Sequence, residues 1–216
     1  GLAKRKELKQ ALETSYNLNQ SSTYMLDLMK TIYIAENKSA GGYDSYLNNL
    51  KSVSGQEELK TKIRQMLISK DAPGFKLLDQ NGNTVTLESQ RGKVVVLDFW
   101  ASWCAPCKAA FPGMKLAVDH FTKDPDVAFF FVDTQEKRTD IKEYVSKYML
   151  ENSYPFTVLL DANSEVSKKF GVGPIPHKII VDAHGKIRFS EVGYMGSPSE
   201  LSDEIIEMVN VLREEK

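Results

Sequence analysis

The only two cysteines of this 216-residue chain, Cys104 and Cys107, stand two residues apart, directly after a run of apolar residues. That run, Val94–Trp100, contains one charged residue, as expected for a strand covered on both faces of a sheet. Pro106 suits the first turn of a helix, where its missing N–H would have no partner. The apolar residues that follow are spaced as in a helix packed on the sheet: Ala109, Ala110, Met114, Leu116, Ala117, Val118 and Phe121. We therefore predict strand, Cys-x-x-Cys and helix in immediate succession.

A cysteine at a helix N-terminus is placed for thiol chemistry. The free N–H groups and positive dipole end of the helix stabilise an anion, and the thiolate is the reactive form of cysteine. We expect Cys104 to be an exposed, low-pKa nucleophile. Cys107, one turn further on, would close a disulfide with it and resolve a mixed disulfide with substrate.

Two plainer roles compete with redox chemistry for this pair. A zinc site needs about four ligands, and only His120, His177 and His184 are left to join the two cysteines, without paired spacing. A structural disulfide stabilises by closing a long loop, and a two-residue spacer closes almost none. The strand before the pair favours a redox site, and we predict no metal.

The segment "VVVLDFWASWCAPCKAAFP" resembles the active site of the thioredoxin superfamily, and more closely its TlpA/ResA-like extracytoplasmic thiol-disulfide oxidoreductases. The resemblance extends to "DAPGFKLLDQNGNTVTLESQRGK" and "GVGPIPHKIIVDAHGKI", and covers roughly Ser69 to Lys216. It implies an α/β thioredoxin-like fold, with a central mixed sheet flanked by helices and an added N-terminal β-hairpin. The expected domains are a helical region at residues 1–70 and a catalytic domain at residues 71–216.

The region before residue 71 has no strand pattern and no catalytic motif. Ser54-Gly55-Gln56-Glu57 has the form of a capping box, which predicts a new helix start. The apolar stripes must be covered, either within a small helical bundle packed on itself or on the catalytic domain, or by a partner or a second copy of the chain. The sequence leaves both open. Four stripes have helical spacing: Leu8, Ala11, Leu12 and Ser15; Met25, Leu28, Met29, Ile32 and Ala35; Tyr43, Tyr46, Leu47 and Leu50; Leu59, Ile63, Met66 and Leu67.

Strand and helix patterns alternate through the rest of the chain. Phe75–Leu78 and Thr84–Leu87 flank a turn in which Gly82 supplies a positive φ, which predicts a hairpin. Ser197-Pro198-Ser199-Glu200 has an N-cap, an N1 proline and an N3 glutamate, which predicts the start of the last helix. Between them we expect strands at 127–133, 154–160, 178–181 and 187–192, and helices at 141–148 and 166–170.

Asp98 lies within the apolar strand, six residues before Cys104. A carboxylate in apolar surroundings is costly to bury ionised, so we expect a raised pKa; an aspartate at a solvated edge is the alternative. The resemblance implies that Asp98 acts as general base for Cys107. Its TlpA/ResA-like members often carry instead a glutamate three residues after the second cysteine, where this chain has Ala110.

The resemblance also implies a substrate-binding cis proline next to the cysteines. By position Pro176, at the head of a predicted strand, is that residue rather than Pro174, although two ordinary trans prolines are the alternative. Substrate contacts are expected from Trp103, Ala105, Pro106, Ile175 and Pro176. His177 either tunes Cys104 as an imidazolium or faces solvent.

The composition is that of an ordinary globular protein, with a net charge of -1 that gives no field for nucleic acid. No apolar run approaches the ~20 residues of a membrane span, and no signal peptide is recognisable in a chain that begins at Gly1. The resemblance implies an extracytoplasmic location.

The function expected from these observations is that of a protein-disulfide reductase without cofactor, whose partners are a disulfide-containing protein and a dithiol or disulfide redox partner. A copper-binding or recognition module on the same fold is the alternative. A peroxidase would require a lone reactive cysteine. The sequence does not predict the oligomeric state.

Overall fold

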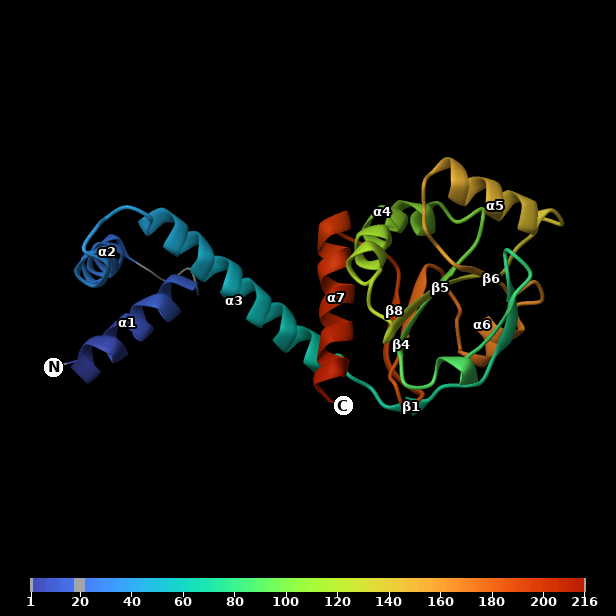
Figure 1. Cartoon of the computed structure of the whole chain (residues 1–216), viewed down its shortest axis with the longest axis horizontal. Coiled ribbons are helices and arrows are strands. Elements are labelled where there is room, and N and C mark those ends of the chain that lie inside the picture. The colour runs from blue at the N-terminus through green and yellow to red at the C-terminus, as the bar shows by residue number, and fades with distance from the viewer. Residues whose placement is uncertain (1, 18–21, 216) are drawn as a thin grey trace. The chain divides into compact units, whose positions relative to one another are not determined.

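The computed structural model describes residues 2–17 and 22–215 (Figure 1). The chain divides into two compact units, Gly1–Thr61 and Lys62–Lys216. The division falls inside a helix, before the boundary that we expected after residue 70.

The first unit consists of helices. It contains α1 (Leu2–Asn17), α2 (Thr23–Asn37) and most of α3 (Tyr43–Gln65). Ser22 is the N-cap residue of α2, and its hydroxyl accepts a hydrogen bond from the Met25 backbone N–H. The core of this unit holds one or two members from each of the first three predicted stripes: Leu12, Met29, Ile32 and Tyr43.

The capping box predicted at Ser54 is wrong, because α3 runs without interruption from Tyr43 to Gln65. A glycine inside a helix costs only about 1 kcal/mol, and Gly55 stands between two stretches of helix-forming sequence. The end of α3 belongs to the second unit, where Ile63 is fully buried. There Lys62 forms an ion pair of 3.0 Å with Glu204.

The second unit is built on an eight-stranded mixed sheet in the order β1-β8-β7-β4-β5-β6-β2-β3. Strand β4 lies in the middle and all seven of its residues are buried, as its apolar sequence predicted. It pairs parallel with β5 and antiparallel with β7. The strands are β1 (Lys70–Asp71), β2 (Lys76–Asp79), β3 (Thr84–Thr86), β4 (Val94–Trp100), β5 (Val127–Asp133), β6 (Val158–Leu160), β7 (His177–Val181) and β8 (Lys186–Val192).

Helices cover both faces of this sheet (Figure 1). On one face Phe111 of α4 (Ala105–His120) packs edge-on against Trp100 and Phe131. Helix α7 (Pro198–Glu214) packs against α4, and a Cβ added to Gly113 would come within 2.7 Å of the Pro198 carbonyl oxygen, so this position requires glycine. On the other face α6 (Glu165–Lys169) covers an apolar core that includes Phe99 and Val166. The other helices of this unit are η1 (Glu88–Gln90) and α5 (Ile141–Glu151).

Most predicted elements of this unit are confirmed, including the hairpin and the capping box of Ser197 and Glu200. The strand expected at 154–160 is shorter, because β6 begins only at Val158. Pro155 lacks an N–H for a sheet. The Gln80 side chain instead donates to the Phe156 carbonyl and accepts from the Val158 N–H.

Candidate active site

The cysteine pair lies where the central strand ends and α4 begins. Cys104 is the N-cap residue of α4, and its Sγ accepts a hydrogen bond of 3.3 Å from the Cys107 backbone N–H. Ala105 and Pro106 form the first turn. The helix start is therefore where the sequence predicted it, and the N–H that would stabilise a Cys104 thiolate already points at its sulfur. In this structure the two cysteines are joined by a disulfide.

The expectation that Cys104 is exposed is wrong for this oxidised form. Only 3% of Cys104 and 1% of Cys107 are exposed, because the N-cap side chain turns inward to its partner. The residues beside Cys104 are exposed: Ala105 and Pro106 lie at the surface, and 52% of Trp103 is accessible. Cys104 therefore lies directly beneath the surface, whereas Cys107 faces the interior.

The segment around Pro176 reaches the same edge of the sheet. Strands β4 and β7 run antiparallel with Phe99 opposite His177, so the end of β4 lies beside the start of β7. The Ile175–Pro176 bond is cis, as predicted for Pro176 rather than Pro174. Substrate contact by Trp103, Ala105, Pro106, Ile175 and Pro176 stays a prediction.

A loop that the sequence analysis missed connects these two segments. Gln135, directly after β5, accepts a hydrogen bond from Trp103 Nε1 at its backbone oxygen and donates its side-chain amide to the Gly173 carbonyl, at 3.0 and 2.8 Å. Glu136 accepts the Ser102 N–H at 2.8 Å. Burial opposes ionisation of Glu136, but hydrogen bonds from Ser102 and its neighbours prevail and lower its pKa. The sequence feature that could have identified Gln135 and Glu136 as site residues is their position directly after a predicted parallel strand, where functional loops lie.

Asp98 is buried, and its pKa is raised, as the sequence predicted; the solvated alternative is wrong. Burial raises the pKa of Asp98 to about 6, against the opposing effect of the Lys178 ammonium. Phe131 lies opposite Asp98 on β5 and packs against Phe111 of α4. Asp98 therefore faces the side of the sheet on which α4 carries Cys107.

Asp133 is a second buried acid near this edge that the sequence analysis did not single out. It ends β5 opposite Trp100. Burial raises the pKa of Asp133 to about 8, and the charges of Glu136 and Asp161 add to the effect.

His177 is buried rather than solvent-facing. Burial, assisted by the charge of Lys178, lowers the pKa of His177, which disfavours the imidazolium form that was expected to tune Cys104. Its Nε2 lies 2.8 Å from the Ser190 hydroxyl. His177 pairs with Phe99, which belongs to the core on the face opposite Asp98.

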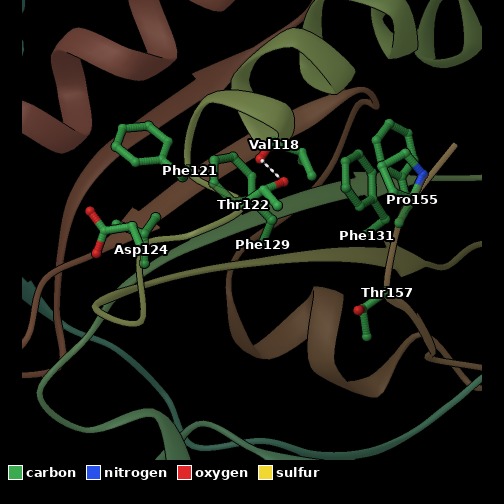
Figure 2. Close-up of a pocket in the computed structure, with 10 residues that line it drawn as sticks. Val118, Phe121, Thr122, Asp124, Phe129, Phe131, Pro155 and Thr157 are labelled. Atoms are coloured by element: carbon green, nitrogen blue, oxygen red, sulfur yellow. Dashed lines mark hydrogen bonds between the residues drawn. The ribbon is translucent and has the colours of Figure 1, made fainter.

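Two cavities lie away from the cysteines. One, of about 180 Å³, is lined by Val118, Phe121 and Phe131 at the far end of α4 (Figure 2). Figure 2 shows apolar rings there and a hydrogen bond from the Thr122 hydroxyl to the Val118 carbonyl. The other is an open groove lined by residues of β2, β3 and α6 and by 160–163. Neither contains a group that could take part in disulfide exchange.

Across residues 2–17 and 22–215, no helix has the length and apolar character required to cross a bilayer. Within the same residues, no three His, Cys, Asp or Glu side chains converge as metal ligands would.

Comparison with known proteins agrees with this geometry. The model of the AhpC/TSA family matches residues 68–190. The thiol-disulfide oxidoreductase ResA of Bacillus thuringiensis subsp. konkukian is 34% identical over 127 residues, which cover 59% of this chain and 70% of the relative. ResA of Geobacillus thermodenitrificans is 27% identical over 168 residues, covering 78% and 88%.

Among solved structures, the thioredoxin domain of a thiol-disulfide oxidoreductase from Bacteroides vulgatus is similar with a TM-score of 0.54 and 28% identity. The match covers 65% of this chain and 96% of that domain. The chain belongs to the AhpC/TSA family and is a ResA-like thiol-disulfide oxidoreductase with a thioredoxin-like fold.

Proposed function

We propose that this protein reduces disulfides of exported proteins, with Cys104 as nucleophile and Cys107 as resolving thiol. The observation that supports this most directly is the position of Cys104 Sγ at the N-cap of α4, where it accepts the Cys107 N–H. A thiolate formed there is stabilised by that hydrogen bond and by the helix dipole.

The reduced enzyme acts in two exchanges. The Cys104 thiolate attacks one sulfur of the substrate disulfide, and the other sulfur leaves as a thiolate. The Cys107 thiol then loses its proton and attacks Cys104 Sγ, which releases the second substrate sulfur and leaves the Cys104–Cys107 disulfide. A dithiol partner restores the reduced form. Only sulfur, electrons and protons are exchanged, so we expect no metal or organic cofactor.

Asp98 is the proposed acceptor for the Cys107 proton. It lies on the face that α4 covers, and its pKa of about 6 allows it to be ionised at neutral pH yet basic enough to take a proton. Ala110 cannot do so, and no other acid is proposed for this step.

The substrate is proposed to bind across the exposed residues beside Cys104 and the cis-proline segment. Trp103, Ala105 and Pro106 supply the exposed surface, and the half-buried Ile175 and the buried Pro176, which directly precede β7, border it. The proposed location is extracytoplasmic, which rests on the likeness to the ResA group.

A trapping experiment tests this function. In Cys107→Ser the second exchange is blocked, so Cys104 should retain exported proteins as mixed disulfides that a dithiol releases. The matched control is Cys104→Ser/Cys107→Ser, which should retain none. Equal capture by both proteins would overturn the proposal.

The reduction potential tests the direction. A value near that of thioredoxin, roughly -270 mV, is expected for a reductase, whereas a value near roughly -120 mV would mark an oxidant. Tight stoichiometric copper binding by reduced protein that cannot reduce insulin would assign it to the binding class instead.

A further inference from the structure

Three charged residues form a row across three adjacent strands. Asp98 of β4 lies opposite Lys178 of β7, and Lys178 lies opposite Glu191 of β8. Directly paired residues share one face of a sheet, so all three side chains lie on the face that α4 and α7 cover. In this row one ammonium stands between two carboxylates.

The inner half of the row is closed off from water. Lys178 Nζ lies 3.9 Å from Asp98 Oδ1, and the two side chains are 4% and 2% exposed. Within the described part of the chain, neither Asp98 oxygen nor Lys178 Nζ has a hydrogen-bond partner. Their interaction is therefore that of two charges in a low-dielectric interior, where a counter-charge has its largest effect on protonation.

The outer half of the row leads toward solvent. Glu191 is half-buried, and burial raises its pKa, followed by the charge of Glu204, while Lys62 and Lys178 oppose this. Lys62 and Glu204 are paired with each other at 3.0 Å at the surface. On its other side Asp98 is paired with Phe131 of β5, which carries no charge and packs against Phe111 of α4.

We propose that Lys178 and Glu191 are positioning residues that set, in opposite directions, the pH at which Asp98 accepts the Cys107 proton. This inference rests on the role proposed above for Asp98. The proton passes from Cys107 Sγ to Asp98, the Cys107 electron pair forms the bond to Cys104 Sγ, and the substrate thiolate leaves. The Lys178 ammonium favours the Asp98 carboxylate, and Glu191 weakens that effect by adding a negative charge on the opposite side.

The test is the pH profile of the resolving step in single turnovers. Reduced protein is mixed with a symmetric nitrophenyl disulfide, which releases one coloured thiol on attack by Cys104 and a second on resolution by Cys107. The rate of the second release should decrease when the pH is lowered past the pKa of Asp98, because the protonated carboxyl cannot accept the Cys107 proton. In Lys178→Met this acidic limb of the pH profile should move to higher pH by about one unit. At a pH on the limb, the rate of the second release should then drop about tenfold. In Glu191→Gln the limb should move to lower pH.

Glu204→Gln is the matched control, because the charge of Glu204 acts on Glu191 but Glu204 does not belong to the row of Asp98, Lys178 and Glu191. It should move the limb less than Glu191→Gln. In an Asp98→Asn background both shifts should vanish. A direct readout is the ¹³C chemical shift of the Asp98 carboxyl carbon in reduced protein, which should titrate at a higher pH in Lys178→Met and a lower pH in Glu191→Gln.

Shifts of the same sign in the two variants, or no shift in either, would overturn the inference while the second release itself still occurs. Should Lys178→Met fail to fold, the downward shift in Glu191→Gln decides alone. Failure of the proposed function has a different signature: no second release in the wild type, or a profile that Asp98→Asn leaves unchanged.

Discussion

The two sulfurs of one disulfide have different surroundings, although a single helical turn separates them. Cys104 lies beneath exposed residues, and the segment that carries it is tied to the loop after β5 through Trp103 and Gln135. Cys107 faces the interior, on the side of the sheet where Asp98 and Lys178 form a dry ion pair. Attack on a large substrate requires access, whereas resolution within the enzyme requires a proton acceptor shielded from water. Under the proposed mechanism, the exposed residues beside Cys104 suit the first role and the buried surroundings of Cys107 suit the second.

The largest effect should be the difference in reactivity between the two thiols of the reduced protein. Iodoacetamide at pH 7 should alkylate Cys104 about tenfold faster than Cys107, because the Cys104 sulfur accepts the Cys107 N–H at the helix N-terminus. Mass spectrometry of partly alkylated protein measures the ratio.

Cys107→Ser provides the control for this prediction, because its remaining thiol should keep the fast rate, while the thiol of Cys104→Ser should react slowly. Equal rates in the two variants would remove the distinction between an outer and an inner sulfur.

The next largest effect should come from the acid on the inner side. The pKa of Asp98 is about 6 in the folded protein and about 3.9 in the unfolded chain. Burial of the ionised carboxylate therefore destabilises the folded protein at pH values above about 3.9. Wild-type stability should therefore fall as pH rises from 4 through 6, by up to about 3 kcal/mol from this residue alone. Asp98→Asn should lack this decline, as urea unfolding at pH 4, 5, 6 and 7 would measure.

Asp133→Asn serves as the comparison for that measurement. The pKa of Asp133 in the folded protein is about 8, so its effect on the free energy of unfolding should extend to higher pH than that of Asp98. If the difference between wild type and Asp98→Asn stayed constant from pH 4 to 7, Asp98 would be as solvated as an ordinary carboxylate.

Features that depend on local sequence could be predicted. The apolar strand, the proline after Cys104 and the Ser197–Glu200 box each specify an element within a few residues. Asp98 could be recognised as perturbed because its strand neighbours are apolar. The same local rules failed at Ser54, where a capping pattern lies inside a longer helix.

Features that depend on register could not be predicted. Nothing in the sequence around Lys178 indicates a functional role. Its position beside Asp98 depends on the pairing of β7 with β4, which places the two residues opposite each other. Gln135 likewise joins Trp103 to Gly173 across segments far apart in the chain. The inward turn of Cys104 follows from its disulfide and its N-cap bond together.

On the outer side, Gln135→Ala should have a moderate effect. It removes the 2.8 Å hydrogen bond to the Gly173 carbonyl, which should lower stability by about 1 kcal/mol and raise KM for insulin reduction more than it lowers kcat. Gln135 has a φ of 53°, so Gln135→Gly removes the same bond but relieves the backbone. The glycine variant should be the more stable of the two, with the same raised KM; a lower stability for glycine would show that this backbone position is not strained.

The smallest effect should follow Trp103→Phe, which keeps an aromatic surface beside Cys104 but loses the 3.0 Å bond from Nε1 to the Gln135 carbonyl. Because the indole is half exposed, water replaces that bond and the loss should be about 0.5 kcal/mol. Lys137→Met removes the ammonium 5.8 Å from the same ring and should cost no more. Substrate binding should depend on the ring rather than on either partner, so Trp103→Ala should raise KM for insulin well above both variants while leaving the pH profile of the resolving step unchanged. A shifted profile in Trp103→Ala would mean that the outer surface also controls the inner acid, and the two sides of the disulfide would then not be independent.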